Sequence, residues 1–88
     1  MNKKIIVKYG SEYSTKFVDK LIKELNLPVW SDGSSRYVAI HDKDIKDDII
    51  VFKDTDEHFV HSVDKNEKLI EKLSLDQAVQ KVKGFLNN

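Results

Sequence analysis

The spacing of apolar residues changes twice along this 88-residue chain, and the two changes predict a fold that mixes helices and strands. Phe17, Leu21 and Leu25 recur every four residues, which is the spacing of one face of a helix. Residues 36–63 instead contain three short runs rich in β-branched and aromatic residues, "RYVAIH", "DIIVFK" and "HFVHSV", which are typical of strands. Residues 74–86 return to a helical spacing. We therefore expect strands between two helices.

Turn and cap residues set the expected limits of these elements. Pro28 predicts the end of the first helix, because the residue before a proline is pushed out of helical geometry. Asp32 and Gly33 lie between apolar segments, which indicates a hairpin turn. Ser74 and Gln77 have the spacing of a capping box, so we expect the second helix to begin there.

Residues 66–73 fit two structures equally well. Leu69, Ile70 and Leu73 have a spacing that suits a helical turn. The polar residues 64–67 also suit a hairpin turn that leads into one more strand. The sequence leaves both possibilities open.

The order of the elements predicts an α+β fold of two layers. "KKIIVKY" at the start of the chain reads as a further strand, because Lys4, Ile6 and Lys8 alternate with apolar residues. Short connections favour antiparallel neighbours. We expect a single domain over residues 1–88, in the order strand, helix, three or four antiparallel strands as a meander, and helix. Both helices should pack on one face of the sheet.

Composition excludes several classes of protein. There is no cysteine, which excludes disulfides and thiolate metal sites. No apolar run approaches the ~20 residues that cross a bilayer. The first apolar stretch, residues 5–7, is too short for the core of a signal peptide. We therefore expect a cytoplasmic protein that does not engage membranes.

The three histidines do not have the arrangement of a metal site. His58 and His61 differ by an odd number of positions on one strand, so they should point to opposite faces. His41 and His61 would share one end of a meander, but with a strand between them their backbones would lie about 9–10 Å apart. We therefore rank a small metal-dependent enzyme that uses His41 and His61 only third among our hypotheses.

No pattern of nucleophilic catalysis or cofactor binding is present. The acidic run that begins at Asp42 fails as a calcium loop, because Lys46 and Asp47 occupy the positions of a ligand and a glycine. There is no Gly-x-Ser-x-Gly elbow, and the three glycines are too far apart to cradle a phosphate. We predict a protein that is not an enzyme, with no catalytic residues, metal or cofactor.

The charges are unevenly distributed although they sum to zero. Residues 1–37 carry a net +3, residues 38–64 carry −5 and residues 65–88 carry +2. Acidic loop edges favour a basic partner, because complementary charge speeds encounter and suppresses wrong partners. We therefore predict a non-catalytic interaction module that binds a protein, as an adaptor or inhibitor. Domains of this kind from phages and mobile elements often act on nucleic-acid-handling enzymes.

The predicted contact residues combine the loop acids with aromatic anchors, since aromatic residues dominate interface hot spots. They are Asp42, Asp44, Asp47, Asp48, Asp54, Asp56, Glu57, Trp30, Tyr37 and His41.

A nucleic-acid-binding domain is the alternative hypothesis. Helix, three antiparallel strands and helix is also the element order of double-stranded-RNA-binding domains, although topology alone does not carry function. Such a domain needs a basic face. Six lysines of the first strand and helix are expected to form it. They are Lys3, Lys4, Lys8, Lys16, Lys20 and Lys23.

Overall fold

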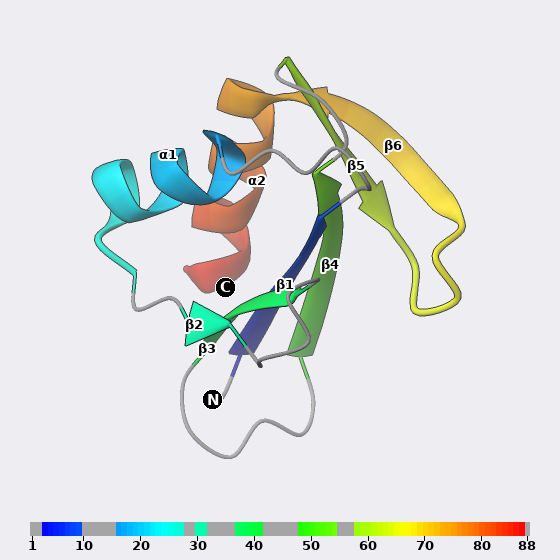
Figure 1. The fold of residues 1–88 in the computed structure, drawn as a ribbon, viewed down its shortest axis with the longest axis horizontal. Helices are drawn as coiled ribbons and strands as arrows, with labels where there is room; N and C mark the ends of the chain where they lie inside the picture. Colours follow the sequence, from blue (N-terminus) through cyan, green and yellow to red (C-terminus); the bar gives the residue numbers. More distant parts are fainter. Residues whose placement is uncertain are drawn as a thin grey trace.

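In the residues that it describes, the computed structural model shows a six-stranded sheet with two helices on one of its faces (Figure 1). It describes residues 3–9, 16–27, 30–31, 37–41, 48–54 and 58–87. The elements are β1 (Lys3–Tyr9), α1 (Lys16–Leu25), β2 (Trp30–Ser31), β3 (Tyr37–His41), β4 (Asp48–Asp54), β5 (Phe59–Val63), β6 (Leu69–Ser74) and α2 (Leu75–Leu86). The predicted α+β class, with both helices on one face of the sheet, is confirmed.

The sheet is mixed, so the expectation of a purely antiparallel meander is wrong. The strand order is β2-β3-β1-β4-β5-β6. β1 lies between β3 and β4, antiparallel to β3 and parallel to β4. Six residues separate β3 from β4 in the chain, and an extended segment of that length reaches about 20 Å, enough to pass an intervening strand. The meander is confirmed only for β4, β5 and β6.

The segment that the sequence left open forms a hairpin and not a helical turn. Asp64 organises the turn between β5 and β6, because its Oδ1 accepts hydrogen bonds from the backbone N–H groups of Asn66 (2.8 Å) and Lys68 (2.9 Å). The Asp64 carbonyl accepts a third bond from the Glu67 N–H at 2.9 Å. Glu67 has φ 62°, a left-handed conformation that usually favours glycine. Leu69–Ser74 then pairs with β5 as strand β6.

The helix ends use local backbone signals, one of which the sequence analysis missed. α2 has the predicted capping box: the Gln77 N–H donates to Ser74 Oγ at 3.2 Å, and the Ser74 N–H donates to Gln77 Oε1 at 2.9 Å. α1 ends at Leu25, and Asn26 follows with φ 51° and an N–H that donates to the Ile22 carbonyl at 2.9 Å. Asn26 therefore terminates the helix as a left-handed C-cap. Pro28, the predicted stop, lies outside the described residues.

The core lies between the helices and the face of the sheet that they cover. Phe17 of α1 and Phe52 of β4 are both fully buried, with ring centroids 5.0 Å apart in an edge-to-face arrangement. The other buried residues of this core are Ile5, Val7, Val18, Leu21, Val60, Leu73, Ala78, Val79 and Val82. The opposite face of the sheet carries neither described helix (Figure 1).

Candidate functional site

The helix-free face of the sheet gathers basic side chains. Successive residues of a strand point to opposite faces, so Lys4, Ile6 and Lys8 alternate with the buried Ile5 and Val7 of β1. The same alternation on β4 separates Ile49, Val51 and Lys53 from its core-facing residues. The helix-free face therefore combines aliphatic and cationic side chains.

Four of its side chains lie in a row across four neighbouring strands. Lys8 of β1 is opposite Lys53 of β4, Lys53 is opposite His61 of β5, and His61 is opposite Lys72 of β6. Neighbouring strands are about 4.8 Å apart, so the row spans about 14 Å. We call Lys8, Lys53, His61 and Lys72 the basic row.

Among the described residues, the carboxylate of Glu67 partly neutralises the basic row. Glu67, in the β5–β6 turn, places Oε2 at 2.9 Å from Lys8 Nζ and Oε1 at 3.9 Å from Lys53 Nζ. The hydrogen bond from Lys8 and the charges of Lys8 and Lys53 lower the pKa of Glu67. Within the part of the chain that the structure describes, three lysines of the row face this one carboxylate.

An exposed aromatic ring lies beside the row. Phe59 is two residues from His61 on β5, so it points to the same face, and its relative exposure is 39%. Lys72 Nζ lies 4.5 Å from the centroid of the Phe59 ring, a cation–π contact. The site therefore offers both cations and an aromatic surface.

The structure does not gather the contact residues predicted from the sequence. Five of them lie outside the described residues: Asp42, Asp44, Asp47, Asp56 and Glu57. Four others are placed by their backbone only. Trp30 is opposite Ala39, Tyr37 is opposite Lys8, His41 is opposite Lys4, and Asp48 is opposite Lys3. Tyr37 thus stands at one end of β1 and of the basic row, whereas His41 and Asp48 stand at the other end of β1.

Asp54 does not belong to an exposed loop, so its predicted position is wrong. It is the last residue of β4, opposite Val60, and both residues have a relative exposure of 0%. β4 extends one residue beyond the run "DIIVFK" that predicted it. A buried Asp54 cannot meet a partner at the surface.

His41 and His61 are too far apart to share one ion. Two strands, β1 and β4, lie between the strands that carry them. His41 is opposite Lys4, whereas His61 lies in the row that includes Lys8, four positions further along β1. The two backbones are therefore about 19 Å apart by strand geometry, against the ~2 Å of a zinc–nitrogen bond. Within the described ranges, no group of three or more His, Asp or Glu residues has the geometry of a metal site.

The six lysines expected to form one basic face are divided between two sides of the molecule. Lys4 and Lys8 are on the helix-free face, while Lys16, Lys20 and Lys23 belong to α1 on the other side. The sixth, Lys3, is placed by its backbone only, opposite Asp48. Lys20 forms ion pairs with Asp76 (3.0 Å) and Glu24 (3.3 Å), which raise its pKa. The predicted lysine face is therefore wrong, and the sequence analysis missed Lys53 and Lys72, which only the strand pairing brings beside Lys8.

Comparisons with known proteins add no functional assignment. A scan against protein-family models, a search of curated proteins and a search of solved structures each found no match. Neither described helix has the length and apolar character needed to span a membrane. Function is therefore inferred from the geometry of the site.

Proposed function

We propose that this chain is a non-catalytic nucleic-acid-binding module whose helix-free sheet face binds single strands. The observation that carries the proposal is the basic row, Lys8, Lys53, His61 and Lys72, held in register across four strands. Lysines bind phosphate groups and release the counterions condensed on a nucleic acid. A row of this kind supplies the charge that such binding requires.

The basic row places like charges beside one another, which lowers the stability of the folded protein, and this supports a binding role for the row. Like charges directly opposite one another on neighbouring strands are destabilising. Lys8 and Lys53 are directly opposite, and Glu67 is closer to Lys8 than to Lys53. An anionic ligand along the row would add to the compensation that Glu67 provides.

The aromatic ring favours a single-stranded nucleic acid over a structureless polyanion. Base–aromatic stacking contributes about 1–3 kcal/mol per base and needs unstacked bases with free faces. Phe59 is 39% exposed beside Lys72, so a base that displaces the Lys72 ammonium group from the ring can stack there while the neighbouring phosphate meets that lysine. The combination matches the way in which sheet surfaces bind single strands.

The test compares two double variants that remove the same charge from opposite sides of the protein. Lys53→Gln with Lys72→Gln changes the row, and Lys23→Gln with Lys83→Gln changes exposed positions on α1 and α2. Binding is measured as fluorescence anisotropy of a labelled oligothymidine of about 12 nucleotides. The row variant should bind at least about tenfold more weakly, and its slope of log K against log salt should fall by about 1.4, since each lost single-strand phosphate contact removes about 0.7.

The helix variant is the matched control and should stay within about twofold of the unmodified protein. Equal losses in the two variants would mean that net charge alone governs binding. Equal affinity of the row variant and the unmodified protein would show that the basic row does not contribute to oligonucleotide binding. Either result contradicts the proposed function.

A protein partner bound by acidic loops is the second candidate, and one observation favours it. His41 and Asp48 bound the acidic segment 42–47, and they are opposite Lys4 and Lys3 at the start of β1. The residues that flank the acidic segment therefore lie on either side of β1. A pull-down with Asp44→Lys, Asp47→Lys and Asp48→Lys combined tests it: loss of one enriched basic protein supports an adaptor or inhibitor role, and unchanged retention contradicts it. Both candidates assume a cytoplasmic protein.

A further inference from the structure

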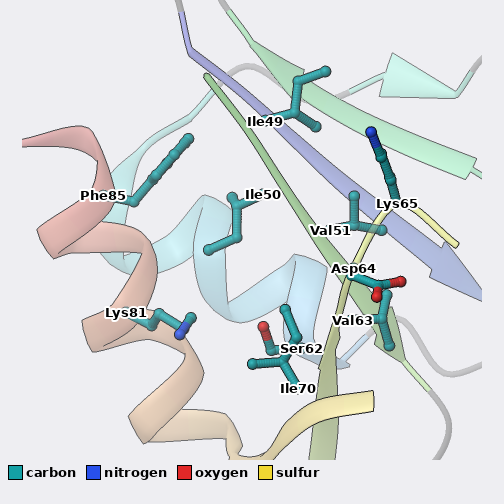
Figure 2. Close-up of a pocket in the computed structure, with 10 residues that line it drawn as sticks. All are labelled: Ile49, Ile50, Val51, Ser62, Val63, Asp64, Lys65, Ile70, Lys81 and Phe85. Carbon is teal, nitrogen blue, oxygen red and sulfur yellow. The ribbon is translucent and has the colours of Figure 1, made fainter. Parts of the chain in front are cut away.

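A groove opens where β4 and β5 separate. Its cavity volume is ≈ 490 Å³, within the range of ordinary ligand sites. One wall is formed by Ile49, Ile50 and Val51 of β4, and the other by Ser62 and Val63 of β5. Figure 2 shows Phe85 of α2 on the same side of β4 as Ile50, whereas Ile49 and Val51 lie on the other side of the strand. The groove thus follows the edge of a strand.

Within the described residues, the edge of β4 that faces β5 is only partly paired. β5 pairs with β4 from Val51 to Asp54, whereas β1 pairs with β4 along all of its length from Asp48. Residues 48–50 therefore have β1 on one side and no strand of the described part of the chain on the other. An open strand edge presents N–H and C=O groups that can pair with another chain.

The lining of the groove suits apolar side chains. Ile49 and Ile70 have relative exposures of 50% and 60%. They contribute to the groove with Ile50 and Phe85, which are only partly buried. Apolar surface that is exposed beside an open strand edge is the combination that binds an added strand.

Among the described residues that line the groove, one cation, Lys65, forms no ion pair with another described residue. The Asp64 carboxylate accepts two backbone N–H groups of its own turn. Lys81 is paired with Glu71. Lys65 is exposed and has no ion pair with the part of the chain that the structure describes. The rim therefore favours a ligand that carries one acidic group.

We propose that this groove binds an extended peptide segment of a partner protein, which adds a strand to the open edge of β4 at residues 48–50. Its alternate apolar side chains contact Ile49 and Val51 on one face of the sheet and Ile50 and Phe85 on the other. An acidic residue of the segment faces Lys65. This site is separate from the basic row, because no residue of the row lines it.

A second copy of this chain is a poorer occupant than a free peptide segment. A two-fold dimer places the same surface of both copies in contact. The open edge of β4 lies inside a groove, between β1 and the β5–β6 hairpin. Two recessed edges cannot reach one another, whereas a single extended segment can enter.

The test uses a random peptide library displayed on phage and a pair of matched variants. Ile70→Lys places a charge on the groove lining, and Leu69→Lys places the same charge on the neighbouring residue of β6, which is equally exposed at 59% but does not line the groove. Circular dichroism and thermal unfolding first confirm that both variants fold. The library is then selected on the unmodified protein.

Selected peptides should show alternating apolar residues with one acid. Their affinity should fall at least about tenfold with Ile70→Lys, because the lysine would need to be buried, and little with Leu69→Lys. Hydrogen exchange at the amides of residues 48–50 should slow when a selected peptide binds. Failure to select peptides, selection without alternation, or equal binding to both variants would overturn the proposal. If the unmodified protein forms a dimer and Ile70→Lys dissociates that dimer, the groove binds a second copy of the chain. This result would overturn the peptide proposal.

Discussion

The ammonium group of Lys8 lies 2.9 Å from the Glu67 carboxylate, although the two residues belong to β1 and to the turn between β5 and β6. β4 lies between β1 and β5 in the sheet, and its Lys53 is 3.9 Å from the same carboxylate. The pair therefore links the hairpin turn to the centre of the sheet across the helix-free face. It also fixes one end of the basic row.

Replacing Glu67 with glutamine should make the protein less stable at neutral pH but not in acid. The pKa of Glu67 is lowered from its ordinary value of 4.5, so the folded state favours the ionised carboxylate. Its contribution to stability is therefore fully present above pH 4.5 and is lost as the pH falls through the lowered pKa. Urea unfolding of the two proteins should differ at neutral pH, and the difference should shrink as the pH falls below 4.5 and through the lowered pKa of Glu67.

A constant difference between the two proteins across this pH range would contradict the ion pair. High salt provides a second check. The side chain of Glu67 is 45% exposed, so salt should screen much of its attraction to the lysines and reduce the difference at neutral pH.

The two phenylalanines Phe52 and Phe59 should respond in opposite ways to alanine substitution. Phe52 is fully buried against Phe17, so Phe52→Ala should lower the free energy of unfolding by about 3–5 kcal/mol. Phe59 is 39% exposed, so Phe59→Ala should cost much less stability. It should instead weaken oligonucleotide binding by about 1–3 kcal/mol, the contribution of one stacked base. Unfolding curves and anisotropy titrations of both variants measure the two effects. Phe59→Ala binding with unchanged affinity would exclude stacking at this position.

Replacing Asn26 with glycine should preserve the stability of the protein, whereas replacing it with alanine should lower the stability. Its φ of 51° costs an ordinary side chain about 1–2 kcal/mol, and glycine adopts it freely. Asn26→Ala should therefore be destabilised by about 1 kcal/mol relative to Asn26→Gly. Denaturant titration of the two variants gives the difference directly, and equal midpoints would contradict the assigned role of Asn26 as the cap of α1.

Local patterns predicted the helices better than the sheet. Ser74 and Gln77 are three residues apart, so their capping box can be read from a short segment. The position of β1 between β3 and β4 depends instead on contacts between distant parts of the chain, which no short segment specifies. Asp54 was misplaced for a related reason, because an acidic residue beside other acids resembles a loop unless the burial of β4 is known.

The basic row could be predicted only in part. The alternation of Lys4, Ile6 and Lys8 indicates that both lysines of β1 share one face. The same parity places Phe59 and His61 together on β5. Strand order and register decide which lysines become neighbours. A register shift of one residue would move every lysine of the shifted strand to the opposite face. The row therefore emerges only when the strands are paired.

The most direct test of the nucleic-acid proposal is a nuclear magnetic resonance titration of the labelled protein with an unlabelled single-stranded oligonucleotide. The largest amide shift changes should fall on Lys8, Lys53, His61 and Lys72, together with Phe59 beside them. Amides of α1 and α2 should change little, because both helices lie on the opposite face of the sheet. Shift changes concentrated on the helices, or none at a saturating concentration of oligonucleotide, would contradict it.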